Sequence, residues 1–177
     1  LTCSSRAPGE VQHGFGERLI LGPAQRGTDA QAVAGLLASA GFKAELSSDI
    51  RRDIWFKLWG NMTMNPISAL TRASCDAILD DELVRAFMAR GMAEAAAIGA
   101  VIGCPIEQSA EDRMNVTRQL GAFKTSMLQD AEAGRRLEFG ALVGAVREIG
   151  QRVGVTTPNI DALLGLTRLL ARQMRTS

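Results

Sequence analysis

Apolar and polar positions alternate near the start of the chain, which favours β-structure. Between residues 9 and 22 the alternation is interrupted by glycine at positions 14 and 16. Alternation broken in this way is typical of two strands joined by a turn. We therefore predict a β-hairpin over residues 9–22, with one strand around Val11, His13 and Phe15 and the other formed by Arg18, Leu19, Ile20 and Leu21.

The next segment changes to a helical period and then returns to a strand. Thr28 is a suitable N-cap for a helix over residues 29–40, whose apolar residues fall on one face, and Gly41 is a suitable stop. A short strand is expected from Phe42 to Leu46. Signals for strands end there, so we place a boundary near residue 48.

From residue 49 onward the chain shows only helical periodicity, broken by glycine and proline. Asp49 is the expected cap of the first helix, and Pro66 suits the first turn of a second one, unless a single helix kinks there. Gly99 and Gly103 suggest that a later helix approaches a neighbouring backbone closely. Further helices are expected over residues 80–102, 109–133, 137–153 and 160–174.

This pattern predicts a mainly α fold with two parts, residues 1–48 carrying the strands and residues 49–177 forming a compact helical domain. The chain begins with Leu1 in sequence that suggests strands and turns, so we expect it to be a piece of a longer polypeptide. Residues 2–9 do not resemble a signal peptide, and the most apolar helical stretch, residues 93–104, is too short to cross a bilayer.

Composition narrows the functional classes. The chain has 46% hydrophobic and 22% charged residues, which is typical of a folded globular protein. Twenty basic against nineteen acidic residues give a net charge of +1, so neither nucleic acid nor a membrane surface is an expected partner. Cys3, Cys75 and Cys104 are odd in number and far apart, which argues against disulfides or a zinc site and favours a reducing cytoplasm.

A first group of candidate residues lies at four-residue spacing. Lys57, Asn61 and Asn65 would share one face of a helix. The apolar residues flanking Lys57, among them Trp55 and Trp59, would lower the pKa of its ammonium and suit it to donate a proton. The alternative is that Lys57 only extends from an aromatic face to solvent while the asparagines cap or pair locally. Spacing alone leaves both open.

A second group pairs Ser126 with Glu138, twelve residues apart and separated by the helix-breaking Gly134. The two residues would belong to different helices and could face one cavity. Alternatively, Glu138 is an acid in a first helical turn and the neighbouring Asp130, Arg135 and Arg136 are solvated surface groups. No metal site is expected.

Two other kinds of site are not supported by the sequence. The only histidine, His13, lies in the predicted hairpin, so a Ser-His-Asp triad has no base. Gly14-Phe15-Gly16 lacks the third glycine of a dinucleotide-binding loop.

Together, the segments Trp55 to Thr71 and Lys124 to Glu138 resemble the ketopantoate reductase (2-dehydropantoate 2-reductase) family. The specific features are K-x3-N-x3-N-P and S-M-L-Q-D followed by a glutamate. The segments Pro8 to Gly14, Leu19 to Gly22 and Gly154 to Asn159 are also similar to that family, so the resemblance covers nearly the whole chain.

The resemblance implies an NADPH-dependent oxidoreductase of pantothenate biosynthesis that reduces a 2-keto acid to a 2-hydroxy acid. Its fold would be a Rossmann domain followed by a helical domain of the 6-phosphogluconate-dehydrogenase-like kind, with the substrate between the two and a homodimer possible through the helical domain. By position, Lys57 would be the general acid and Glu138 would bind the substrate hydroxyl. Asn61 and Asn65 would line the substrate site, and Ser126 would hold the substrate carboxylate.

The sequence also departs from the family. Cys75 and Phe123 stand where some relatives have asparagine near the substrate, and Gly140 and Val143 replace an aspartate and an asparagine. These differences suggest a different or bulkier 2-keto acid. The Gly-rich strand-turn-helix expected for NADPH is absent from these residues, so residues 1–48 would be the remnant of the nucleotide domain and the chain would be inactive alone.

Two further interpretations stay open. One is a helical module without catalysis that serves in dimerisation or in binding a small acid. The other is a related 3-hydroxyacid dehydrogenase.

Overall fold

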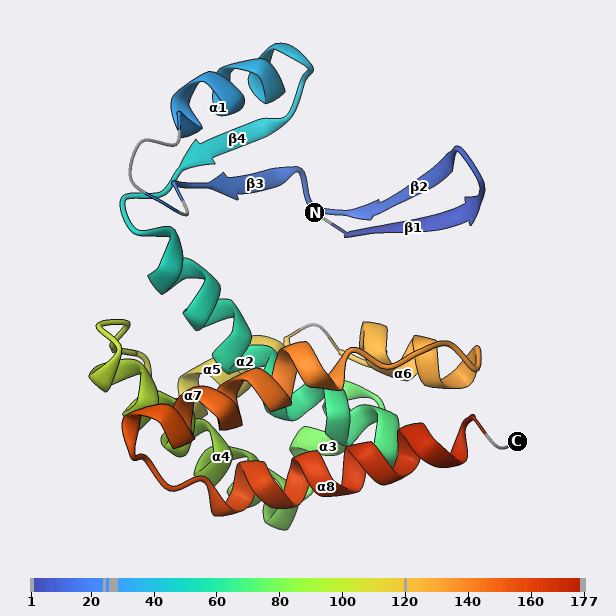
Figure 1. Cartoon of the computed structure of the whole chain (residues 1–177). Helices are drawn as coiled ribbons and strands as arrows, with labels where there is room; N and C mark the ends of the chain where they lie inside the picture. The colour runs from blue at the N-terminus through green and yellow to red at the C-terminus, as the bar shows by residue number, and fades with distance from the viewer. Residues whose placement is uncertain (1, 24, 26–28, 120, 176–177) are drawn as a thin grey trace. The chain divides into compact units, whose positions relative to one another are not determined.

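The computed structural model describes residues 2–23, 25, 29–119 and 121–175. The chain divides into two compact units, residues 1–54 and 55–177, and the division falls inside one long helix. In its described residues the first unit carries four strands, one helix and the start of the long helix, and the second unit is helical (Figure 1). The mainly α fold class predicted from the sequence is confirmed.

The hairpin of the first unit lies earlier in the chain than predicted. Strand β1 (Thr2–Ala7) pairs antiparallel with β2 (Glu10–Phe15). Pro8 and Gly9 form the turn, and Gly9 has a φ of +80°, as the third position of a type II turn requires. The predicted pairing of residues 11–15 with residues 18–21 is wrong, because this Pro-Gly turn joins the second strand to residues before it.

Strand β3 (Arg18–Leu21) instead pairs in parallel with β4 (Lys43–Leu46), and helix α1 (Ala30–Ser39) connects them. The predicted helix and the predicted strand after it are confirmed. Thr28, the predicted N-cap, lies outside the described residues. The Asp29 carboxylate accepts a hydrogen bond from the Ala32 N–H at 2.9 Å, and Gly41 follows the helix with a φ of +91°.

Helix α2 (Ile50–Thr71) is a single element of 22 residues, so the alternative of two helices is wrong. Asp49 caps it as predicted, and its carboxylate accepts hydrogen bonds from the N–H groups of Arg51 (3.1 Å) and Arg52 (3.3 Å). Pro66 lies in the helix interior, and the helix continues past it to Thr71.

The later helices follow the predicted pattern with two corrections. The helix predicted from residue 80 begins after Asp81, whose carboxylate accepts hydrogen bonds from the first turn. The prediction of a single helix over residues 109–133 is wrong. This segment forms two short helices, which are capped separately by Ser109 and Thr125. The elements are α3 (Cys75–Asp80), α4 (Glu82–Val101), α5 (Ala110–Arg118), α6 (Ser126–Glu132), the π-helical turn η1 (Gly140–Gly144), α7 (Ala145–Val153) and α8 (Pro158–Gln173).

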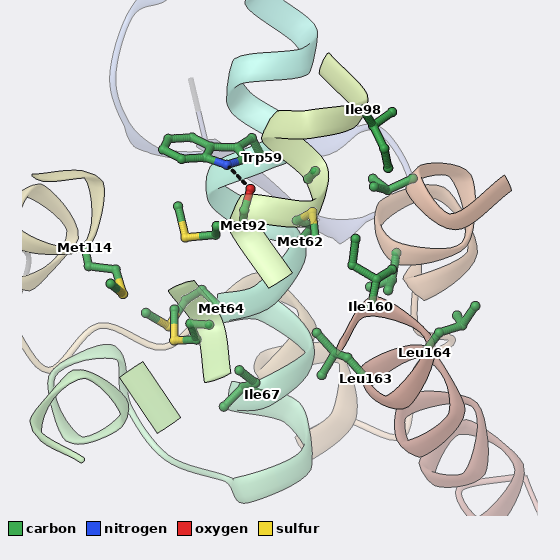
Figure 2. Close-up of a cluster of buried hydrophobic side chains, with 14 of the residues drawn as sticks. Trp59, Met62, Met64, Ile67, Met92, Ile98, Met114, Ile160, Leu163 and Leu164 are labelled. Carbon is green, nitrogen blue, oxygen red and sulfur yellow. Dashed lines mark hydrogen bonds between the residues drawn. The ribbon is translucent and has the colours of Figure 1, made fainter. Parts of the chain in front are cut away.

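The core of the helical unit is rich in methionine and joins α2 to α4, α7 and α8 (Figure 2). The indole N–H of Trp59 donates a hydrogen bond of 2.8 Å to the Met92 carbonyl on α4, within this core. Gly99 makes room for the Trp55 indole of α2 and for the turn that ends its own helix, where a Cβ would lie 2.6 Å from the Cys104 carbonyl oxygen, so the close neighbour is a side chain rather than the predicted backbone. Gly103 has no such neighbour: a Cβ there would meet nothing within 4 Å, and its φ of +79° serves the turn after α4. Among the described helices, none combines the length and apolar character needed to traverse a membrane.

Candidate functional site

Helix α2 holds three of the five candidate residues on a rigid support. Lys57, Asn61 and Asn65 follow one another at four-residue intervals on an uninterrupted helix, so they form one strip along it. The opposite side of α2 is buried, with Trp59 only 2% exposed and Met62 fully buried. The strip is therefore fixed by the packing of the core behind it.

The side chains of this strip have no partner within the part of the chain that the structure describes. Lys57 is exposed, and Asn61 and Asn65 are half-buried; none of the three makes a side-chain hydrogen bond or ion pair there. The desolvated setting predicted for Lys57 is not present in this chain, because its aromatic neighbours Trp55 and Trp59 turn inward. The asparagines neither cap nor pair locally.

Ser126 is the first residue of α6 and is exposed. The buried Thr125 before it fixes the helix start, since its hydroxyl oxygen accepts a hydrogen bond of 3.1 Å from the Leu128 N–H. The Ser126 hydroxyl itself has no hydrogen-bond partner among the described residues. It is thus placed at a defined point and is free to meet a ligand.

Glu138 precedes the π-helical turn η1, and its carbonyl oxygen accepts a hydrogen bond of 3.2 Å from the Leu142 N–H. Its side chain is exposed and, within the described residues, neither ion-paired nor hydrogen-bonded, so it is not ion-paired with Lys57. The roles that the resemblance implies for Lys57 and Glu138 therefore stay predictions. π-Helical turns occur frequently at functional sites.

Glu138 also forms part of the wall of an open pocket of about 890 Å³. The wall continues over Phe139 and Ala141 to the end of α8 at Met174 and Arg175. Lys57, Asn61, Asn65 and Ser126 are not part of it. This pocket therefore brings only one of the five candidates to a concave surface.

Two ion pairs lie around the second group, whereas Arg136 has no partner among the described residues. The Lys124 ammonium lies 2.7 Å from the Glu132 carboxylate, and Arg135 donates to Asp130 at 2.8 Å. Both pairs are largely exposed and contribute little to stability. Asp130 and Arg135 thus form a surface ion pair, as the alternative interpretation expected of surface groups.

Two residues that the resemblance places near the substrate have different surroundings. Cys75 is 1% exposed, and its N–H donates a hydrogen bond of 3.0 Å to the Phe123 carbonyl. Burial, followed by the nearby Asp76 carboxylate, raises the pKa of the Cys75 thiol. The Phe123 ring is 46% exposed. Phe123 can therefore contact a ligand, whereas the thiol of Cys75 faces the interior.

One residue of interest was missed by the sequence reasoning. Arg113 on α5 is half-buried, its Nε has no hydrogen-bond partner among the described residues, and burial lowers the pKa of its guanidinium. Its Cζ lies 5.2 Å from the centroid of the Phe56 ring on α2. No signal in the sequence joins positions 56 and 113, which are far apart in the chain.

Neither a metal-binding cluster nor a glycine-rich turn after β3 is found among the described residues. No group of three or more histidine, cysteine, aspartate or glutamate side chains in the described ranges is arranged to hold a metal. After β3, Gly22 is followed by Pro23 rather than by a glycine-rich turn, and a Cβ at Gly22 would lie 2.5 Å from Ile50 Cβ. That glycine therefore makes room for the Ile50 side chain.

Comparison with known proteins gives consistent matches. Residues 49–171 match the family model described as Ketopantoate reductase PanE/ApbA C terminal. A 2-dehydropantoate 2-reductase of Mesorhizobium japonicum is 44% identical over 167 residues, which are 93% of this chain and 51% of that protein. The chain thus spans about half the length of this curated relative.

Solved structures show the same fold. The structure of a candidate ketopantoate reductase from Ralstonia solanacearum MolK2 is 62% identical, with a TM-score of 0.91 over 98% of this chain and 53% of that one. A D-mandelate dehydrogenase with NADH and anilino(oxo)acetate is 24% identical, with a TM-score of 0.84 over 98% of this chain and 59% of that one. At that identity the likeness concerns the fold alone.

Proposed function

Because this chain belongs to the ketopantoate reductase C-terminal family, we propose that it is the substrate-binding and proton-donating part of an NADPH-dependent reductase. The reaction would convert a 2-keto acid to a 2-hydroxy acid, as the name of the relative from Mesorhizobium japonicum suggests. The chain has about half the length of that relative, so the activity is proposed for a complete protein that contains it.

One observation supports the proposal most directly. All five candidate side chains, Lys57, Asn61, Asn65, Ser126 and Glu138, lack a hydrogen-bond or ion-pair partner within the described part of the chain. Groups that act on a ligand must be available to it, and side chains already paired within the protein are not. By contrast, Lys124 and Asp130, which lie near Ser126, are both ion-paired within the protein.

The proposed mechanism assigns the proton to Lys57. The cofactor would supply a hydride, and it would be held by residues outside this chain. Transfer of the hydride to the keto carbon leaves negative charge on the oxygen, and the Lys57 ammonium is proposed to donate a proton to it. Because Lys57 is exposed, solvent can return that proton afterwards.

The other candidates would position the substrate. Asn61 and Asn65 follow Lys57 along the same strip of α2, so their amides can hold polar groups of a substrate that lies against it. Ser126 is proposed to donate a hydrogen bond to the substrate carboxylate, and Glu138 to accept one from the substrate hydroxyl. Removing Ser126 should therefore weaken substrate binding more than it slows the chemical step.

Steady-state kinetics of the complete reductase would test these roles. A positioned general acid contributes about 10²- to 10⁴-fold to rate, so Lys57→Ala should lower kcat by that order while Ser126→Ala mainly raises KM. Lys124→Ala is the matched control, because Lys124 is paired with Glu132 and is assigned no role. A kcat of Lys57→Ala within threefold of wild type would refute the assignment.

The exposed ring of Phe123 favours a second candidate function, in which the substrate is a 2-keto acid bulkier than ketopantoate. Activity of wild type and Phe123→Asn on ketopantoate, 2-ketobutyrate and phenylglyoxylate would distinguish these two substrate classes. The bulkier substrate predicts that Phe123→Asn loses activity on phenylglyoxylate and gains it on ketopantoate. If the wild-type protein reduces no 2-keto acid, the catalytic proposal fails and a non-catalytic module is favoured; activity on 3-hydroxy acids would favour the related dehydrogenase.

We also propose a homodimer working in the cytoplasm. Apolar residues on the surface of α8 support the dimer, since Leu166 and Leu169 are 54% and 53% exposed at three-residue spacing. Sedimentation equilibrium of wild type and Leu166→Glu would test it, since a charge in an apolar interface should dissociate the dimer.

A further inference from the structure

The Arg113 guanidinium lies in a seat formed by two residues of α2. Besides the ring of Phe56, this seat includes Gly60, where a Cβ would lie 2.5 Å from Nε and 2.7 Å from Nη2 of Arg113. A flexible side chain could swing away from such a Cβ, but it would then leave the Phe56 ring. Glycine at position 60 therefore lets the guanidinium rest directly on the α2 backbone.

The charge of Arg113 is not balanced within the chain that the structure describes. Its Nε is buried without an acceptor, and no carboxylate lies within ion-pair distance of the guanidinium there. Arg118, five residues further along α5, donates instead to Asp80. A half-buried cation usually has a counter-ion, because removing charge from water is unfavourable. The Phe56 ring compensates only partly.

The seat lies beside the strip of α2 that carries the candidate site. Gly60 is three residues after Lys57 and one before Asn61, and residues three apart are neighbours on a helix surface. A guanidinium that contacts Gly60 therefore adjoins the proposed proton donor. A 2-keto acid is ionised at neutral pH, and the planar fork of arginine suits a carboxylate better than any other side chain does.

We infer that Arg113 binds the carboxylate of the substrate and so selects anionic substrates. This inference rests on the proposed function and adds to it a residue that determines specificity. It does not displace Ser126, because a carboxylate has about four acceptor positions and can receive both donors. The other anion that could reach a cation here is a phosphate of the cofactor, and the experiment separates the two.

The test compares Arg113→Gln, Arg113→Lys and the control Arg118→Gln in the complete reductase. Each is assayed with a 2-keto acid and with its uncharged methyl ester. A hydrogen bond to a charged group is worth enough to change affinity about 10- to 100-fold. Arg113→Gln should therefore raise KM for the acid by that factor and leave KM for the ester and for NADPH within twofold, whereas Arg113→Lys should lie between and Arg118→Gln should match wild type.

Two results would overturn the inference. One is an equal change of KM for acid and ester, which a merely structural arginine would give. The other is a rise in KM for NADPH alone, which would mean that Arg113 binds a cofactor phosphate. Gly60→Ala provides a second variant, since it should displace the guanidinium and raise KM for the acid without removing the charge.

The binding affinity for oxamate, a 2-keto acid analogue that is not reduced, tests the role of Arg113 without depending on the proposed catalytic function. Oxamate should bind about 10- to 100-fold more weakly to Arg113→Gln than to wild type. Equal affinity would reject the role of Arg113 even in an active reductase. If the wild type reduces no 2-keto acid, the proposed function fails, and the oxamate titration still decides whether Arg113 holds a carboxylate.

Discussion

Glu94 on α4 caps the start of α8, and replacing it by alanine should lower the stability of the helical unit by about 3 kcal/mol. One carboxylate oxygen accepts hydrogen bonds from the N–H (2.9 Å) and the Nδ2 (2.6 Å) of Asn159, and the other accepts one from the Ile160 N–H at 3.0 Å. These N–H groups belong to the first turn of α8, where no earlier carbonyl of the helix can reach them.

The magnitude follows from these three contacts. Loss of a capping side chain costs about 1 kcal/mol, and each buried N–H left without an acceptor costs about 1–3 kcal/mol. Because Glu94 and Asn159 are only half-buried, water can replace part of the loss, which gives about 3 kcal/mol for alanine. Glu94→Gln should cost about half as much, since its oxygen can still accept from Asn159 while its NH₂ group faces the Ile160 N–H.

Urea unfolding followed by tryptophan fluorescence is the suitable assay. The chain has two tryptophans, Trp55 and Trp59, and both are buried in the helical unit, so the signal reports on that unit alone. Glu148→Ala is the matched control, because Glu148 is exposed, pairs with Arg152 on the same helix and should cost less than about 0.5 kcal/mol. A Glu94→Ala variant no less stable than Glu148→Ala would refute the capping argument.

Two further predictions concern the same unit. Gly99→Ala should cost about 1–3 kcal/mol, because its Cβ would overlap the Trp55 indole nitrogen, whereas Gly165→Ala, which meets nothing within 4 Å in α8, should stabilise by about 0.5–1 kcal/mol in the same unfolding assay. The pKa of the Cys75 thiol is raised in the folded state, mainly by burial. The stability that the thiol contributes is therefore complete below its unfolded pKa of about 8.5 and is lost as the pH rises through its folded pKa. Unfolding midpoints between pH 7 and 10 should therefore fall more steeply for wild type than for Cys75→Ala, and parallel curves would contradict this.

Much of the fold could be predicted because its helix boundaries depend on local chemistry. Asp49 caps α2 with its own side chain, and Gly41 and Gly154 end helices in left-handed conformations that glycine adopts without strain. The strand pairing failed because a turn signal was assigned to the wrong residues: Pro8-Gly9 makes the turn, and the glycines at 14 and 16 do not.

The contacts between distant segments could not be predicted in the same way. Glu94 and Asn159 are 65 residues apart, and a glutamate within a helix gives no sign that it caps another one. The seat of Arg113 likewise depends on α5 lying against Gly60 of α2. Such pairs are decided by how helices pack, which the periodicity of each helix does not specify.

The structure bears on the two interpretations of Asn61 and Asn65 in α2, a local cap and a ligand-binding group. Spacing allowed Asn65 to be a cap, because an asparagine directly before proline is a good start for a new helix. The structure removes that possibility, since α2 continues through Pro66 to Thr71 and Asn65 lies inside it. In a helix interior nearly all backbone groups are already paired, so Asn61 and Asn65 find no local partner there. Among the described residues these two half-buried amides beside Lys57 have no protein partner, so they are available to a ligand.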